Sequence, residues 1–151
     1  MKKALFLIAA ASAFGLAGPT LLAHTDDVLE TQKAPNGGQL RMAGVYHYEL
    51  VVAKDSKEAK DNAVVVYVTD HDGKKVATSG ASGTATILAG KAKATATLAP
   101  DGDNRLKGMA KYLSAPDMKV VVSITVPGKA AEQARFTPLA AAKDGHTDHK
   151  H

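Results

Sequence analysis

Short segments of alternating apolar and polar residues recur between residues 45 and 139, and turn-forming residues separate them. Such segments, with a turn signal about every 8 to 12 residues, are typical of an antiparallel β-sandwich. The predicted strands cover residues 45–52, 64–70, 84–88, 91–98, 105–112, 118–126 and 132–139. The sequence therefore predicts an all-β domain over residues 37–139, an antiparallel immunoglobulin-like β-sandwich of about seven strands.

The first 23 residues, MKKALFLIAAASAFGLAGPTLLA, have the three parts of a secretory signal peptide. Lys2 and Lys3 precede an apolar run, and Ala23 is a small residue at which a peptidase could cut. A cut after Ala17 would also fit the small-residue pattern. The apolar run is shorter than the ~20 residues of a membrane span. We therefore expect export to the periplasm, removal of residues 1–23 and no membrane span in the mature chain.

Polar segments flank the predicted domain on both sides. Residues 24–36, HTDDVLETQKAPN, contain Pro35 and are predicted to form an extended N-terminal arm. Residues 140–151 end in KDGHTDHKH and offer the core no apolar partner. A chain end without such contacts is predicted to be disordered in the absence of a ligand.

The composition excludes several classes of function. The chain has 19 Lys and Arg against 15 Asp and Glu; loss of Lys2 and Lys3 with the signal peptide leaves 17 against 15. The charges are therefore nearly balanced, and the sequence contains no cluster of Lys and Arg of the kind that binds nucleic acid. Because the chain has no cysteine, it can form no disulfide or thiolate site. Any bound metal must be held by His, carboxylate, Met or the chain terminus.

Three histidines, His146, His149 and His151, gather in the last six residues. Imidazole is a preferred ligand of Cu(II), Zn(II) and Ni(II), and a flexible chain lets two or three rings converge on one ion. The tail is therefore predicted to bind metal. The alternative is a polar end that only keeps the chain soluble, since a His-rich tract indicates metal binding by composition alone.

His24 becomes the first mature residue if cleavage follows Ala23. A terminal His offers its α-amine and a ring nitrogen to one ion, as in copper carriers of the CopC type and in histidine-brace oxygenases. Such a site needs a second His from the domain, and His47 or His71 would have to supply it.

His47 and Glu49 lie on the predicted outward face of the strand 45–52. Because side chains two residues apart on a strand share a face, both could reach one ion. The alternative is a lone exposed histidine on a solvated face. Soft thioether ligands for Cu(I) are offered by Met42, Met109 and Met118, although Met118 falls on an apolar face, where core packing is expected.

Catalytic motifs are missing from the sequence. It contains no G-x-S-x-G, no H-E-x-x-H, no P-loop and no paired carboxylates in an apolar setting. The chain is therefore not predicted to be an enzyme.

Four stretches together carry a resemblance to known proteins: PNGGQLRMAGVYHYELVV, VVVYVTDHDGKKV, GASGTATILAGKAKATATLAPDGDNRLKG and ARFTPL. They span about residues 34–139, and they resemble a group of small exported proteobacterial β-sandwich proteins that accompany heavy-metal efflux and copper-resistance genes. The resemblance implies a periplasmic role near metal handling. No chemistry is attached to its distinctive GGQL and DGDNRLKG segments, so it assigns no functional residue.

Together these features predict a periplasmic metal-binding protein that prefers Cu(II), with Zn(II) or Ni(II) next. It would act as a buffer or carrier, with a component of a metal-efflux system as its partner. The alternative is a non-catalytic structural or interaction module of the cell envelope with an incidental His tail.

Overall fold

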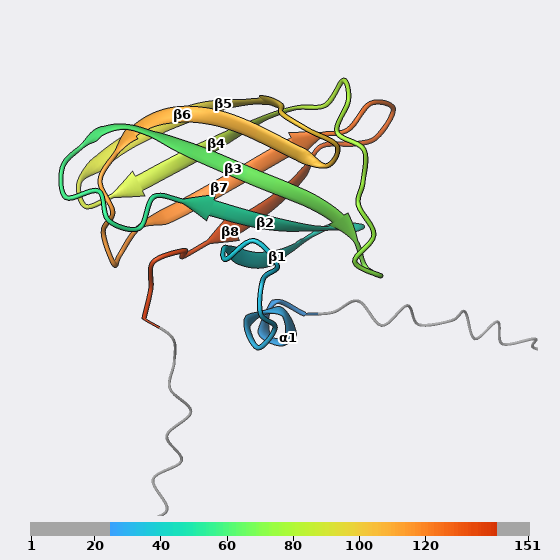
Figure 1. The fold of residues 1–151 in the computed structure, drawn as a ribbon, viewed down its shortest axis with the longest axis horizontal. Coiled ribbons are helices and arrows are strands. Elements are labelled where there is room, and N and C mark those ends of the chain that lie inside the picture. Colours follow the sequence, from blue (N-terminus) through green and yellow to red (C-terminus); the bar gives the residue numbers. More distant parts are fainter. Residues whose placement is uncertain (1–24, 142–151) are drawn as a thin grey trace, which may run out of the picture.

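The computed structural model describes residues 25–141, which contain one short helix and eight strands (Figure 1). The elements are α1 (Asp26–Glu30), β1 (Gln39–Ala43), β2 (Tyr46–Val52), β3 (Lys60–Asp70), β4 (Ser82–Ala89), β5 (Ala92–Pro100), β6 (Arg105–Tyr112), β7 (Lys119–Thr125) and β8 (Glu132–Phe136). The predicted signal peptide, His24 and residues 142–151 lie outside the described residues. No helix between residues 25 and 141 is long and apolar enough to cross a membrane.

Every pair of neighbouring strands is antiparallel, in the order β1-β2-β3-β6-β5-β4-β7-β8. The run β3-β6-β5-β4 is a Greek key, a motif found in most β-sandwiches. β2, β3 and β6 lie in front of β4, β7 and β8 in Figure 1. The predicted antiparallel sandwich is thus confirmed, with eight strands in place of about seven.

The two layers belong to one continuous sheet, because β5 pairs with β4 on one side and with β6 on the other. The sheet curls until its outer strands, β1 and β8, lie against each other. Just beyond β8, the backbone N–H of Thr137 donates to Oε1 of Gln39 in β1 at 2.9 Å. The sandwich is therefore barrel-like, whereas an immunoglobulin domain has two separate sheets.

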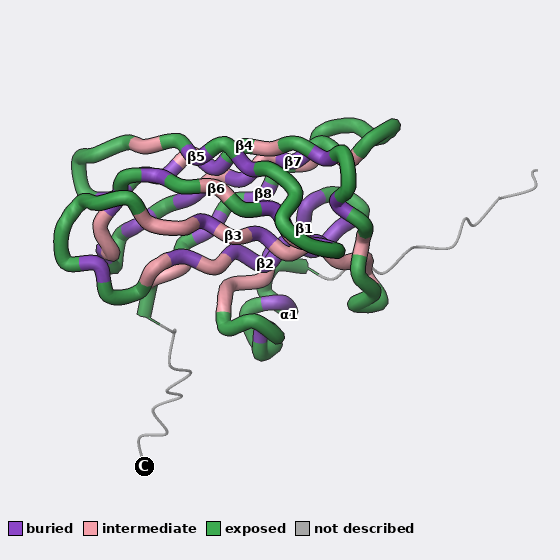
Figure 2. Tube along the Cα trace, turned by 45° about the horizontal axis from the view of Figure 1, so that its top comes forward, coloured by how far each residue is buried: buried purple, intermediate pink, exposed green. Residues whose placement is uncertain are grey.

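The core lies between the layers and follows the alternation seen in the sequence (Figure 2). Its fully buried side chains include Tyr48, Leu50, Val64, Val66, Val68, Ile87, Leu98, Leu106, Tyr112, Met118, Val120, Val122 and Ile124. Full burial of one Val, Leu or Ile side chain contributes about 1.5–3 kcal/mol. Met118 is a core residue, as expected, and Met109 is exposed on β6.

The N-terminal segment differs from the extended arm predicted for residues 24–36. Residues Asp26–Glu30 form the helix α1, and Leu29 is buried. Asp26 and Asp27 occupy the first helical turn, where negative charge is favourable. A helix this short is not stable alone, so its contacts with β1 hold it in place. The sequence pattern did not predict α1, because Leu29 is the one buried residue of this short helix and a single apolar residue shows no periodicity.

Asp72 and Gly73 form the turn that follows β3. Gly73 has a positive φ of 77°, and its N–H donates to the carbonyl of Asp70 at 3.1 Å. The carboxylate of Asp70 accepts the N–H groups of Asp72 and Lys74, each at 2.9 Å. These bonds fix the chain where it leaves β3, and they set the position of His71.

Candidate metal site

The outer face of β2 carries His47 and Glu49, as the alternation predicts, but neither side chain is exposed. His47 is 6% exposed and Glu49 is 3% exposed. Residues 32–36 of the N-terminal segment lie over this face and share a cleft with both side chains. The alternative of a lone exposed histidine is therefore wrong. Alternation shows which face a side chain takes, but not what covers that face.

Glu49 is occupied as a hydrogen-bond acceptor. One carboxylate oxygen accepts the backbone N–H groups of Asn36 and Gly38, at 2.7 and 3.0 Å. The other oxygen accepts from the side-chain amide of Asn36 at 2.9 Å. A buried carboxylate needs such partners to offset its lost hydration. Glu49 therefore holds the N-terminal segment on the sheet through both of its carboxylate oxygens.

His47 and His71 form the one close pair of histidines in the described part of the chain. Nε2 of His47 lies 3.1 Å from Nδ1 of His71, and the two rings meet edge to face at 81°. The β2–β3 ladder sets His47 opposite Thr69. His71 is the first residue after β3, two positions beyond Thr69. The Asp70 turn then keeps its ring beside that of His47.

The separation of the two nitrogens suits a shared metal ion. Two donors each ~2.0–2.1 Å from one ion, at an angle of ~90–110°, lie about 2.9–3.4 Å apart. The observed 3.1 Å falls inside that range. Without metal, the same distance fits a hydrogen bond in which one ring donates its N–H and the other accepts. Metal binding would replace the shared proton, and each ring would have to turn so that its nitrogen lone pair points at the ion and not at the other ring.

The pair alone does not complete a coordination shell. Between residues 25 and 141, no three His, Cys, Asp or Glu side chains gather closely enough to hold an ion. Met42 is the strand partner of His47 on the β1 side, so Met42, His47 and Thr69 form one row across three strands. Met42 is partly buried and is the predicted soft ligand that lies closest to the pair in the strand register.

A cleft of about 370 Å³ leads to His47 from beneath the N-terminal segment. Its walls include Pro35, Leu40, Tyr67 and Lys75. Lys33 is a second cationic side chain of the lining, and most of the remaining lining residues are polar, so the cleft mixes apolar and polar surface. It gives the buried ring of His47 an access route that does not require the sheet to open.

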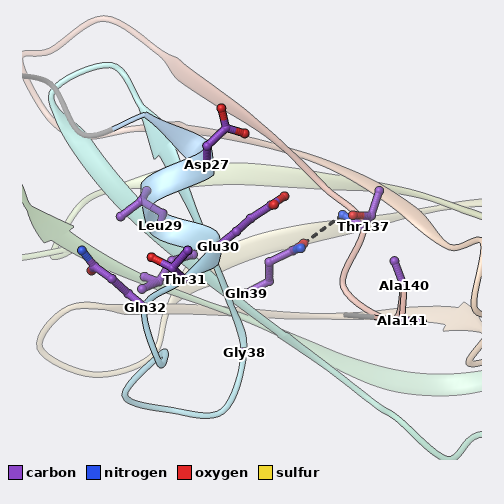
Figure 3. A pocket seen from close by; sticks show the side chains of 11 residues that line it. Asp27, Leu29, Glu30, Thr31, Gln32, Gly38, Gln39, Thr137, Ala140 and Ala141 are labelled. Atoms are coloured by element: carbon purple, nitrogen blue, oxygen red, sulfur yellow. Dashed lines mark hydrogen bonds between the residues drawn. The ribbon is translucent and has the colours of Figure 1, made fainter. Parts of the chain in front are cut away.

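A second hollow, of about 340 Å³, lies between α1, the start of β1 and the segment after β8 (Figure 3). Asp27 and Glu30 are its acidic residues, and its described lining contains no histidine. Glu30 already binds Arg41 in an ion pair of 2.8 Å. This hollow therefore offers a transition metal no nitrogen ligand.

Of the histidines predicted as ligands, only His47 lies within the described residues; His24, His146, His149 and His151 lie outside them. The structure adds His71, which the sequence offered only as an alternative to His47 for the second position of a brace. The sequence did contain a signal that could have placed His47 beside His71. The predicted strands 45–52 and 64–70 are consecutive, and consecutive strands commonly pair in antiparallel orientation. This orientation places the beginning of one strand beside the end of the next.

Comparisons with known proteins add little to the site. The sequence matches no protein-family model and no curated protein. Among solved structures, the fold is similar to the crystal structure of a DUF4426 family protein from Pseudomonas aeruginosa PAO1. The two sequences are 15% identical, the match covers 65% of this chain and 92% of that chain, and the TM-score is 0.45. A likeness this distant carries no argument about function.

Proposed function

We propose that this protein binds a transition-metal ion between His47 and His71, Cu(II) in preference to Zn(II) or Ni(II). The observation that carries the proposal is the 3.1 Å separation between Nε2 of His47 and Nδ1 of His71. Imidazole nitrogen is a preferred ligand of all three ions, and Cu(II) binds most tightly in the usual order of divalent affinities. No thiolate competes, because the chain has no cysteine.

The ion would be cargo and not a structural element. The apolar core between the layers is complete without it, unlike that of a zinc finger, which unfolds when its metal is removed. His71 is partly exposed and a cleft reaches His47, so an ion held there could be exchanged. These properties suit a buffer or carrier, and they require no catalytic step.

The cellular setting belongs to the same proposal. The N-terminal 23 residues favour export, and the resemblance to proteins that accompany efflux genes favours a periplasmic role in metal resistance. A component of a metal-efflux system is the partner such a carrier would serve. Intact-mass analysis of the protein recovered from the periplasm tests export and identifies the mature first residue.

The test of the site uses the mature chain with His146, His149 and His151 replaced by Asn, so that the tail does not bind the probe. Competition titrations with Cu(II) and Zn(II) then compare this chain with its His47→Ala and His71→Ala variants. Loss of residues that merely orient a ligand costs 10- to 100-fold in metal affinity, so removal of either ring should weaken Cu(II) binding by about 100-fold or more.

Lys74→Ala is the matched control, since it replaces an exposed lysine of the turn that holds His71 and keeps the backbone N–H that Asp70 accepts. It should leave Cu(II) affinity within about twofold and the thermal unfolding unchanged. Each histidine variant should also unfold cooperatively in EDTA, which separates loss of binding from loss of the fold. Unchanged Cu(II) affinity in both histidine variants would refute the proposal.

A further inference from the structure

The cleft beneath the N-terminal segment has a floor made by three neighbouring strands. Strand pairing aligns Leu40 of β1, Glu49 of β2 and Tyr67 of β3 in one row, and all three line the cleft. His47 and Thr69 form the neighbouring row. Because side chains directly opposite each other on paired antiparallel strands lie on the same face, the two rows form one continuous floor.

The segment 32–36 covers this floor and is held at both of its ends. At its C-terminal end, the carboxylate of Glu49 accepts two N–H groups of Asn36. At its N-terminal end, the preceding helix α1 is held by the ion pair between Glu30 and Arg41, at 2.8 Å. The cleft is therefore formed before any ligand enters, as most small-molecule sites are.

The charge that is left uncompensated in the cleft is positive. Lys33 of the covering segment and Lys75, beyond the turn that follows β3, are exposed residues of the lining. Within residues 25–141, neither ammonium group takes part in an ion pair. Glu49 is the one carboxylate of the lining, and three N–H groups already bind its oxygens. An anion that enters the cleft thus meets two cations that have no partner.

The second hollow has a similar volume and the opposite charge. It holds about 340 Å³, against about 370 Å³ for the cleft. Its charged lining residues are Asp27 and Glu30, and no Lys or Arg is among its described lining residues. An anion should therefore enter the cleft and avoid the hollow, which provides a comparison within the same molecule.

The uncharged walls indicate what the rest of a ligand would be. Pro35, Leu40 and Tyr67 offer apolar surface, which an inorganic anion would leave without a partner. The volume of about 370 Å³ lies at the lower end of the ~300–1,000 Å³ of small-molecule sites. Such sites combine apolar walls with a few polar groups that orient the ligand. A small ligand with one charged end and an apolar body fits both features.

We propose that the cleft binds a small organic carboxylate, with its charged end at Lys33 and Lys75 and its apolar body against Tyr67. This inference goes beyond metal binding and does not depend on it. The test therefore uses the metal-free mature chain, in about 0.15 M salt so that exposed charges more than ~8 Å apart are screened.

Four probes separate the contribution of the charge from that of the body. Benzoate and hexanoate carry both, acetate carries the charge alone, and benzyl alcohol carries the ring alone. In two-dimensional ¹H–¹⁵N spectra, benzoate or hexanoate should give saturable shifts at the amides of Asn36, Thr69 and Lys75. The amide of Thr137, beside the second hollow, should not shift. Acetate and benzyl alcohol should bind at least about tenfold more weakly, since each loses one set of contacts.

A matched pair of double variants tests the two lysines. Lys33→Gln/Lys75→Gln removes both cations of the cleft, whereas Lys74→Gln/Lys91→Gln removes two charges from exposed residues outside its lining. The first variant should weaken benzoate binding about fivefold or more, and the second should leave it within about twofold. Both should unfold thermally as the wild type does, because the substitutions are on exposed side chains.

Each outcome supports or refutes the inference. Benzoate and hexanoate shifts that do not saturate, or that spread over the surface, would show that the cleft is not a carboxylate site. Equal benzoate affinity in the two double variants would refute the role of Lys33 and Lys75. Because no metal is present, either failure leaves the proposed function standing, and normal Cu(II) binding by the His47→Ala and His71→Ala variants would refute that function alone.

Discussion

The carboxylate of Glu49 accepts the backbone N–H of Asn36 at 2.7 Å, which joins the middle of β2 to the N-terminal segment. Glu49 lies two residues from His47 on the same face. The spacing in the sequence made Glu49 a candidate second ligand beside His47. In the structure its oxygens bind the N-terminal segment, residues 32–36, which covers the cleft. Its effect on metal binding is therefore expected to be indirect, through the position of that segment.

Glu49→Gln should loosen the N-terminal segment without unfolding the sandwich. A hydrogen bond to a charged group contributes ~1.5–3 kcal/mol, and an amide retains part of the accepting capacity. We expect a loss of about 1–3 kcal/mol in the free energy of unfolding, measured with urea. Hydrogen exchange at the amides of Asn36 and Gly38 should become faster. Glu58→Gln, on an exposed residue, is the control, and an equal effect of the two variants would contradict the assigned role.

Most of the strands were predictable because their alternation survives in the structure. The predicted segments 45–52, 105–112 and 118–126 coincide closely with β2, β6 and β7. β1 (Gln39–Ala43) was missed because QLRMA contains no β-branched residue, so its sequence does not favour a strand. Its pairing with β2 and the bond between Met42 and Asp26 hold it extended.

The site was less predictable than the fold, for a physical reason. Neither the burial of His47 nor its contact with His71 is a local property of either sequence segment. The first depends on residues 32–36 folding back over β2, and the second depends on the β2–β3 register and the turn at Asp70. Hydrophobic periodicity reports the face of a strand and carries no information about such long-range contacts.

Gly108→Ala should be strongly destabilising because two strands approach closely at this position. An added Cβ would clash with the backbone carbonyl oxygen of Thr97 in β5, and a strand backbone cannot move away as a side chain would. In the strand register, β5 and β6 are paired at two positions next to this contact, Ala99 with Lys107 and Pro100 with Leu106. A shift of either strand would disturb this pairing. Overpacking costs ~1–3 kcal/mol, and we expect the upper part of that range in urea unfolding. Lys107→Ala, on the exposed neighbour, should cost less than about 0.5 kcal/mol; similar losses would refute the close approach.

Tyr48 and Tyr112 should make the fold sensitive to alkaline pH. Burial raises the pKa of both hydroxyls, and the charge of Glu132 adds to the effect at Tyr48. Since an unfolded tyrosine has a pKa of ~10, the unfolded chain releases these protons first as pH rises. Stability is therefore complete below pH ~10 and falls above it.

Urea unfolding of the wild type and of the Tyr48→Phe/Tyr112→Phe variant at several pH values between 9 and 11.5 measures this effect. The variant should be less stable throughout, because the Tyr112 hydroxyl donates to the carbonyl of Ala63 and accepts the N–H of Ala53. Its stability should nevertheless decline less steeply with pH. Equal slopes would show that the two hydroxyls do not ionise on unfolding.

The C-terminal histidines are expected to form a second, weaker and independent class of metal sites. His146, His149 and His151 lie outside the described residues, and three imidazoles tethered within six positions raise the local ligand concentration without a prebuilt cavity. Replacement of all three by Asn in the mature chain should remove the weaker phase of a Cu(II) titration and leave the tight phase and the thermal unfolding unchanged.

The complementary His47→Ala/His71→Ala variant should lose the tight phase and retain the weak one. If the tail variant binds as many Cu(II) ions as the unaltered chain, the tail is only a solvated end, and the histidine pair between β2 and the turn after β3 must account for metal binding without it.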